Sequence, residues 1–561
     1  MATPASSSSP ILSEKPVTHT PASSKLGDEE RGSSTDRLRS QTDPSPQHAP
    51  VPNSAHTVGA YQQATDAAQE FWDRFRGKGR RKVGWAESLK NILLSSWLNV
   101  LLIVIPIAWV SHWMFLSHKW GPEPTFVLNF LAIIPLEGIF DWGGEQMALY
   151  LGKDLGDLLV VTLNNAVEAV LAIVLLTKCD LRLLQATIVG VVILHLLLIP
   201  GVSFLVGGSQ IQHQALHPHH TDLNHSLLMI GFVLSTFASS RADLIASVLA
   251  TLLPTAFFAA LDRGATQTTS SGAEAVSAIV TDATRDQILR MSRGIAIMLL
   301  VIYIASRFYL HNPPGEGNAL TVLHDAPQAL KHEEAHLKEE EALTNPWACL
   351  ILLAFTIAIM AATAEFLVES IEGVRETSDI QEEWFGLILL PIVSFSADGA
   401  VAIVFFLESL YDHFTGRERL VPSMLARGRA IDLSIQFTLW WMPFLVLLGW
   451  WIGKPMHLLF DYFEVALLLG ACFLVNYVTA DAKTNWVEGL ILVSFYLMIA
   501  LTTWFYPGQP EVELMLVCFE TVAEAIAGGG EGAAEGAVAG GTEVVAENAT
   551  ELISRAVSHF L

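Results

Sequence analysis

Two carboxylates in the middle of apolar segments are the residues in this sequence most able to do chemistry. Glu168 follows the amides Asn164 and Asn165 in one segment, and Asp398 holds the corresponding place in a second segment. In both segments Ala and Ile stand at the fourth and fifth positions after the carboxylate. A carboxylate at the centre of a bilayer costs at least about 2.5 kcal/mol, so it needs a cation, a proton or a polar partner.

These residue types suit a site at which a cation and protons compete. A hard cation such as Ca²⁺ prefers about six to eight oxygen ligands from carboxylates, amides, carbonyls and water. The predicted metal ligands are Glu168, Asp398 and Asn165, with Asn164 beside them. Two facing carboxylates repel each other, so each can take up a proton when the cation leaves. This competition is the minimal chemistry of an antiporter. The alternative is structural: the same side chains cap broken helices or bond neighbouring helices.

The composition places most of the chain in a membrane. The 561 residues are 52% hydrophobic and only 16% charged, and the mean hydropathy is +0.43. A soluble protein has about 25% charged residues. The formal net charge of −24 argues against nucleic acid as a partner, because phosphate binding needs clustered Lys and Arg. The four cysteines stand far apart in the sequence and predict neither a disulfide framework nor a zinc site.

Apolar runs long enough to cross a bilayer recur along the chain, since a membrane helix needs about 20 residues. We expect about eleven spans, near residues 92–115, 124–142, 155–177, 183–207, 227–261, 290–310, 346–370, 384–410, 431–452, 461–480 and 485–506. Basic residues between 74 and 82 precede the first run, and by the positive-inside rule they place the N-terminus in the cytosol. The predicted fold class is an all-α polytopic membrane protein.

The two carboxylates also predict an internal repeat. Glu168 falls in the third span and Asp398 in the eighth, so the two motifs are five spans apart. An odd offset inverts one half of the protein relative to the other. Inverted repeats around an ion site at the bilayer midplane are a common transporter plan, in which the repeats rock to expose the site to each side in turn.

Several further segments, in consecutive order, resemble the cation/proton exchanger (CAX) family of the Ca²⁺/cation antiporter superfamily. They lie within residues 85–506 and include SWLNVLLIVIPIAW, LRLLQATIVG, AEFLVESIEGVRET, GLILLPIV and VNYVTADAKTNWVEGLIL. The resemblance is to a divergent, fungal-type vacuolar Ca²⁺/H⁺ exchanger. It implies a sodium/calcium exchanger-like fold with a first helix, two inverted five-helix repeats and an acidic helix between them.

The apolar pattern and the resemblance divide the chain into six parts. These are a disordered cytosolic N-terminal region at 1–85, the first transmembrane helix at 86–118, the first exchanger repeat at 119–310, an acidic cytosolic linker helix at 311–345, the second repeat at 346–506 and a Gly/Ala/Glu-rich tail at 507–561. The acidic residues of the linker are Glu333, Glu334, Glu339, Glu340 and Glu341. The resemblance implies that this helix is regulatory and responds to Ca²⁺, whereas the alternative is a solvated charged helix.

The ion-site motifs depart from the family pattern Gly-Asn-x-x-Glu. In the first copy Asn165 and Glu168 match, and the Gly is replaced by an amide. In the second copy the Asn is replaced by Phe395, the Glu is shortened to Asp398, and the His that follows in the family is Gly399. The framework therefore persists while the second half of the site changes.

Span nine and span seven supply further candidates for ion or proton binding. In the ninth span only Ser434 and Gln436 match the family pattern, and Asp432 is a candidate compensating carboxylate. In the seventh span Glu365 and Glu369 are four residues apart and so share one helix face. Both match acids that the family has near its ion pathway, whereas the alternative for both is snorkelling to the membrane interface.

Four other polar residues in or beside the spans are further candidates. His195 in an apolar span is suited to relay protons, or it is a neutral hydrogen-bonded core residue. Glu145, at the end of the second span, resembles a family acid. Arg241 and Asp243 in the fifth span either pair with each other, or Arg241 points into the pathway and repels cations.

The sequence thus predicts a cation/proton antiporter rather than an enzyme, with Ca²⁺/H⁺ exchange across the vacuolar membrane or that of another acidic organelle. Its partners are the transported Ca²⁺ or another cation, protons and membrane lipid, and no cofactor is expected. Two alternatives stay open. One is a transport-deficient regulator or scaffold with the exchanger fold, which Phe395, Gly399 and Arg241 favour. The other is an antiporter for Na⁺, K⁺ or Mn²⁺.

Overall fold

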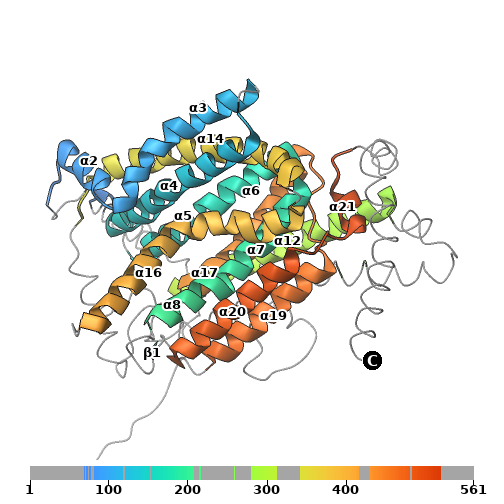
Figure 1. The fold of residues 1–561 in the computed structure, drawn as a ribbon. Coiled ribbons are helices and arrows are strands. Elements are labelled where there is room, and N and C mark those ends of the chain that lie inside the picture. The colour runs from blue at the N-terminus through green and yellow to red at the C-terminus, as the bar shows by residue number, and fades with distance from the viewer. Residues whose placement is uncertain are drawn as a thin grey trace, which may run out of the picture. The chain divides into compact units, whose positions relative to one another are not determined.

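The computed structural model describes two long stretches of the chain and a few residues outside them (Figure 1). The described residues are 69, 71–73, 75–76, 81–117, 120–151, 153–207, 214–215, 255, 258, 280–311, 342–378, 380–415, 429–480 and 483–519. The predicted fifth span, with Arg241 and Asp243, lies outside them, as do the acidic residues of the linker at 333–341 and nearly all of the predicted N-terminal region and of the tail beyond 519.

The described part of the first half is helical except for one short strand. Its elements are α2 (Trp85–Leu93), the 3₁₀ helix η1 (Trp97–Ile103), α3 (Val104–Leu116), α4 (Pro122–Leu151), α5 (Lys153–Asn164), α6 (Ala166–Lys178), α7 (Leu181–Ile193), the π-helical turn η2 (Leu194–Leu198), α8 (Ile199–Gly207), β1 (Gln214–Ala215) and α12 (Asp282–His311).

The second half follows the same pattern. Its elements are α14 (Pro346–Ser378), α15 (Glu382–Trp384), the π-helical turn η3 (Phe385–Leu389), α16 (Leu390–Thr415), α17 (Arg429–Gln436), the π-helical turn η5 (Phe437–Trp441), α18 (Met442–Ile452), α19 (Tyr462–Thr479), β2 (Lys483–Thr484), α20 (Trp486–Thr503) and α21 (Pro510–Leu516). The two strands pair antiparallel and join the segment after α8 to the α19–α20 turn.

The described helices confirm the all-α polytopic fold class. Eight of them are long and apolar enough to cross a membrane, and the bent pair α5–α6 makes a ninth such span. Each of the nine falls on a predicted apolar run. Continuous helix from α15 through α16 occupies the predicted span at 384–410. The predicted run at 227–261 lies outside the described residues.

The third span is broken at the amide pair that precedes Glu168. Helix α5 ends at Asn164 and α6 begins at Ala166, and the two halves bend by 55°. Asn favours helix ends because its side chain competes with the backbone for hydrogen bonds. A break of this kind leaves backbone carbonyls of α5 and N–H groups of α6 without helical partners. Such groups persist inside a membrane only where they are buried in protein or line a cavity.

Three other spans carry a π-helical turn. The turns η2, η3 and η5 interrupt spans four, eight and nine, and each lies within the helix that passes a predicted site residue. Spans four and nine are five apart, so η2 and η5 occupy related places in the two predicted halves. A π-helical turn adds one residue to the helix and frequently marks a functional site.

Glycines set the closest crossings between spans. Gly190 of α7 lies directly on the backbone of Leu387 in η3, and a Cβ at Gly386 would meet Ala186 at 2.5 Å. A second crossing joins α8 and α20, where a Cβ at Gly489 would lie 2.6 Å from the Gly201 carbonyl. Small residues permit such approach in membranes, where dispersion and shape replace the hydrophobic effect between helices.

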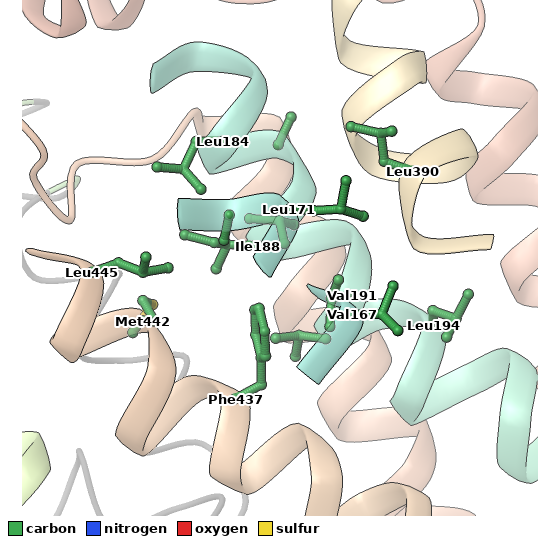
Figure 2. Close-up of a cluster of buried hydrophobic side chains, with 14 of the residues drawn as sticks. Val167, Leu171, Leu184, Ile188, Val191, Leu194, Leu390, Phe437, Met442 and Leu445 are labelled. Atoms are coloured by element: carbon green, nitrogen blue, oxygen red, sulfur yellow. The ribbon is translucent and has the colours of Figure 1, made fainter. Parts of the chain in front are cut away.

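Spans three, four and nine share the most buried part of the apolar core. Figure 2 shows Val167 and Leu171 of α6 beside Ile188 of α7, with Phe437 and Met442 of span nine facing them. All five side chains are at most 1% exposed. Helix α4 packs on the other side of this group, between α14 and α5 (Figure 1). The helices that carry the first motif are therefore held on both sides.

One expectation about the cysteines is wrong. Cys179, in the turn between α6 and α7, pairs with Cys518, which follows α21, and their Cα atoms are 6.4 Å apart. Cys179 adopts the left-handed conformation at φ 67°. Cys349 and Cys472 are free and buried. The bond fastens the segment after the last span to the α6–α7 turn, 339 residues earlier in the chain.

We expect Gly190→Ala to destabilise the protein by about 1–3 kcal/mol, because the added methyl group overpacks the crossing of α7 and η3. Thermal unfolding in detergent micelles measures this loss. The matched control is Gly294→Ala in α12, where a Cβ meets no atom within 4 Å. Equal unfolding temperatures for the two variants would show that the crossing is not tightly packed.

Candidate functional site

Glu168 is the third residue of α6, one turn beyond the break, and its side chain is 2% exposed. The start of a helix carries partial positive charge from its unbonded N–H groups, which favours an anionic side chain there. The carbonyl groups at the end of α5 lie across the break. Glu168 is therefore placed where a carboxylate and backbone oxygens can meet one cation.

His195 of η2 faces this carboxylate. Its Nε2 lies 3.8 Å from Glu168 Oε1, and both side chains are buried. The Nδ1 atom lies 3.0 Å from the Val191 carbonyl oxygen, which requires a hydrogen on Nδ1 and leaves Nε2 with a lone pair toward Glu168 in the neutral ring. A proton entering this space can reside on either group.

Asn165 joins the break to the ninth span. It is fully buried, and its amide nitrogen donates to Gln436 Oε1 at 2.8 Å and to the Leu433 carbonyl at 3.3 Å. Gln436 in turn donates to Thr162 Oγ1 at 2.9 Å. Within the described residues, Asn165 Oδ1 is buried without a hydrogen-bond partner. A buried carbonyl oxygen of this kind is a suitable ligand for a cation.

Two other predicted residues of the ninth span already have partners. Ser434 is fully buried and donates to the Ile431 carbonyl at 2.7 Å. Asp432 forms an ion pair with Arg307 of α12 at 3.1 Å, in which both side chains are largely buried. The Arg307 guanidinium also lies over the Tyr303 ring, 5.0 Å from its centroid. Asp432 thus has a protein cation beside it, one turn from Gln436.

The second motif differs from the first in its backbone. Asp398 lies in α16, which runs unbroken from Leu390 to Thr415, and the Asp398 side chain is outside the described set. The preceding residue, Ala397, donates its backbone N–H to Glu137 Oε2 over a long 3.4 Å. Glu137 belongs to α4 and is 6% exposed.

Helix α4 supplies acids that the sequence reasoning missed. With its amide turned to satisfy both of its ends, Asn164 donates to Asp141 Oδ1 at 3.1 Å. Glu137 and Asp141 are four residues apart and so share a face of α4. That face reaches the break in span three and the segment before Asp398. Both acids stand inside the predicted apolar run 124–142, so the criterion that selected Glu168 also applies to them.

The remaining predicted residues lie away from the break. Glu369 pairs with Lys178 and lies 3.5 Å from His112, and Glu365 lies 3.6 Å from Lys178. Lys178 ends α6, ten residues beyond Glu168, or about 15 Å along the helix axis. Glu145 is exposed near the end of α4. Among the side chains that the structure describes, no three His, Cys, Asp or Glu residues form a metal-binding cluster.

Comparisons with known proteins agree on one family. The family model described as "Sodium/calcium exchanger protein" matches residues 348–505. A vacuolar calcium ion transporter of Cryptococcus neoformans var. grubii is 30% identical in an alignment of 510 positions that covers 78% of each chain. A Ca²⁺/H⁺ antiporter of Synechocystis is 29% identical over 73% of this chain and 97% of the antiporter.

Among solved structures, that of native YfkE covers 73% of this chain and 100% of its own, with a TM-score of 0.50 and 21% sequence identity. At this level of identity the match supports the fold and not the chemistry. The fold of the described helices is thus the sodium/calcium exchanger fold that the resemblance to the cation/proton exchangers implies.

We expect the single substitution Asp432→Leu to destabilise the protein by about 3–5 kcal/mol, because it leaves the Arg307 guanidinium buried without its carboxylate. The double variant Arg307→Met/Asp432→Leu should recover most of that loss, since two apolar side chains replace a buried ion pair at little cost. Unfolding temperatures of both variants in detergent test this. Equal losses in the single and the double variant would contradict a buried pair.

Proposed function

Because the chain belongs to the cation/proton exchanger family of the Ca²⁺/cation antiporter superfamily, we propose that it is a vacuolar antiporter that exchanges Ca²⁺ for protons. The observation that carries this proposal is the buried Glu168 carboxylate at the break in span three. Beside it lie the His195 ring and the side-chain oxygen of Asn165, which has no hydrogen-bond partner among the described residues.

In this proposal the cation is bound by oxygens around the break. Glu168 gives a carboxylate, Asn165 gives its amide oxygen, and the end of α5 gives backbone carbonyls. Asp398 completes the set from the second repeat. The Gln436 amide holds the Asn165 side chain in place by accepting its hydrogen bond at 2.8 Å, so the Asn165 oxygen needs no rotation to meet the ion.

Protons compete with the cation for the same carboxylate. When the cation leaves, the buried Glu168 carboxylate loses that positive charge from its surroundings and takes up a proton. The Nε2 atom of His195, 3.8 Å away, offers a second place for that proton. Rocking of one inverted repeat against the other would open the site alternately to the two sides of the membrane.

The vacuolar location rests on the relatives. Those from Cryptococcus neoformans var. grubii and Schizosaccharomyces pombe carry the name vacuolar calcium ion transporter. With the N-terminus in the cytosol and eleven spans, α6 ends and α7 begins on the lumenal side. The acidic linker at 333–341 would then be cytosolic and the tail lumenal.

A transport-deficient regulator with the same fold is the second candidate. Specific observations favour it: α16 is unbroken where the second motif stands, and Phe395 holds the position of a family amide. In that case Glu168 and Asn165 would bond neighbouring helices without binding a transported ion.

We expect purified protein in liposomes to take up radioactive calcium when a proton gradient is applied, and Glu168→Gln to reduce the uptake to background. The amide keeps the size of the side chain and removes the charge that binds the cation. The matched control is Glu87→Gln, at an exposed glutamate of α2 that pairs with Arg81, which should transport like the wild type.

The outcomes separate the candidates. Uptake by the wild type and by Glu87→Gln but not by Glu168→Gln supports the antiporter. Uptake of Na⁺, K⁺ or Mn²⁺ in place of Ca²⁺ changes the substrate and keeps the mechanism. A folded wild-type protein that moves none of these cations would establish the regulator.

A further inference from the structure

A second group of buried charges lies where α7, α15 and α19 begin, away from the break in span three. Arg182 of α7 donates from Nε to Glu383 Oε1 at 2.6 Å. Its Nη2 donates to Asp461 Oδ2 at 3.2 Å, and its Nη1 lies 3.8 Å from Glu464 Oε2. The four side chains are at most 7% exposed.

The charges of this group do not balance. One guanidinium faces three carboxylates, so the fully ionised group would hold two uncompensated negative charges in a buried place. Burial of unpaired charge is strongly unfavourable, and such groups neutralise by changing protonation. At least one of the three carboxylates therefore has reason to carry a proton.

Asp461 has hydrogen-bond donors on both of its oxygens. It caps α19 by accepting from the Phe463 backbone N–H at 2.8 Å, and the Tyr506 hydroxyl lies 2.8 and 2.7 Å from its two oxygens. Arg182 donates to it as well. Glu383 and Glu464 are therefore the two acids of the group that, among the described residues, hold buried oxygens without a donor.

Glu383 and Glu464 both approach the Arg182 guanidinium, Glu383 Oε1 at 2.6 Å from Nε and Glu464 Oε2 at 3.8 Å from Nη1. Within the described residues, Glu383 Oε2 and Glu464 Oε1 are buried and have no hydrogen-bond partner. Ionised carboxylates only accept hydrogen bonds, so an ionised pair would leave both oxygens unsatisfied beside a like charge. A proton on one of the two acids lowers that cost.

We propose that Glu383 and Glu464 form a second proton-binding site, distinct from Glu168, in which the pair of carboxyl groups holds one proton and Arg182 and Asp461 form a fixed frame. The site does not depend on which cation the protein carries. In the topology proposed above it lies on the lumenal side, where an acidic organelle supplies its ligand.

The surroundings of Glu383 favour its protonated form. Burial, with the Glu464 carboxylate second in effect, raises the pKa of Glu383 to about 9 in spite of Arg182. The segment after the last span covers the group, because a Cβ at Gly508 would meet Glu383 Oε1 at 2.5 Å. The Cys179–Cys518 bond fastens that segment three residues before Arg182.

Other titratable and charged groups stand around the site on each neighbouring element. They are Asp180 before α7, Glu372 and Arg375 of α14, Glu382 of α15, Tyr506 after α20 and Glu513 of α21. Arg375 pairs with Glu382 at 2.6 Å. Burial, with Glu382 next in effect, raises the pKa of Asp180 to about 7. Acidic groups thus outnumber basic groups around the site, and this excess of negative charge favours retention of protons.

The site ties the two repeats together. Arg182 belongs to the first repeat, and Glu383, Asp461 and Glu464 belong to the second. Loss of this proton would place two like charges at the single Arg182 guanidinium and weaken this tie. We therefore expect the ends of spans four, eight and ten to separate more readily at alkaline pH.

The first experiment is infrared difference spectroscopy of the full-length protein in lipid, between acidic and alkaline buffer. We expect a carbonyl band from a buried protonated carboxyl group that disappears only at alkaline pH, and that is absent from Glu383→Gln/Glu464→Gln. The matched control is Glu488→Gln, from the Asn485 capping box of α20, which has the same local geometry as Asp461 and Glu464. Persistence of the band in the double variant would overturn the proposal.

The second experiment measures unfolding temperature against pH. A raised pKa in the fold means that the folded state binds more protons than the unfolded state, so stability falls as pH rises from the ordinary glutamate range toward about 9. Glu383→Gln mimics the protonated acid, so its unfolding temperature should fall less with pH and exceed that of the wild type in alkaline buffer. Glu464→Gln gives an independent second test.

If both single variants lower the unfolding temperature by the same amount at every pH, the two acids are structural and the proposal is overturned. The transport assay reads the proposed function separately. If the wild-type protein transports no cation yet shows the carboxyl band, the proposed function is contradicted and the second proton site stands. If the protein transports Ca²⁺ and lacks the band, the second proton site is contradicted and the proposed function stands.

Discussion

The break in span three is the constraint on which the rest of the structure depends. A helix can be interrupted inside a membrane only where protein groups or a lined cavity satisfy the exposed backbone. Here the Asn165 side chain bonds Gln436 and the Leu433 carbonyl of span nine, and Asp141 of α4 bonds Asn164. Spans two and nine are thus fixed against the break on opposite sides. The Gly190–Leu387 crossing then brings span eight against span four, so the two repeats meet around Glu168 and His195.

Buried charged groups, like the backbone groups at the break, need partners, and this explains how the buried charges are arranged. Two largely buried arginines stand beside acids: Arg307 beside Asp432, and Arg182 beside Glu383, Asp461 and Glu464. The first pair balances and needs no proton. The second group does not balance, so it retains one. Glu168 has the ring of His195 3.8 Å away, and a His can give up its charge. In the proposed function the transported ion binds beside such a group.

Apolar runs and the carboxylate motif predicted the fold because membrane helices are selected by length and hydropathy, which are local properties. Both Glu168 and His195 were candidates because they are polar groups in apolar spans, but their 3.8 Å approach joins two spans and has no local sequence signal. The missed features depend on distant residues. Lys178 comes from the far end of α6 to pair with Glu365 and Glu369, and Cys518 is 339 residues from Cys179. Glu137 and Asp141 were missed although they lie in an apolar run, because span two carries no copy of the repeated motif. The π-helical turns have no local sequence signal.

The unequal backbones of the two motifs bear on how such a site can work. A break supplies backbone carbonyls, whereas the unbroken α16 keeps its carbonyls in helical hydrogen bonds. The first motif can therefore offer a cation more oxygens than the second. The shortened Asp398 and the apolar Phe395 reduce the share of the second repeat further. Helix α4 offsets part of this loss, because Glu137 reaches the Ala397 backbone and Asp141 reaches Asn164. An exchanger with this ligand distribution would hold its cation mainly through the first repeat, and the second repeat would serve chiefly as the surface against which the site opens and closes.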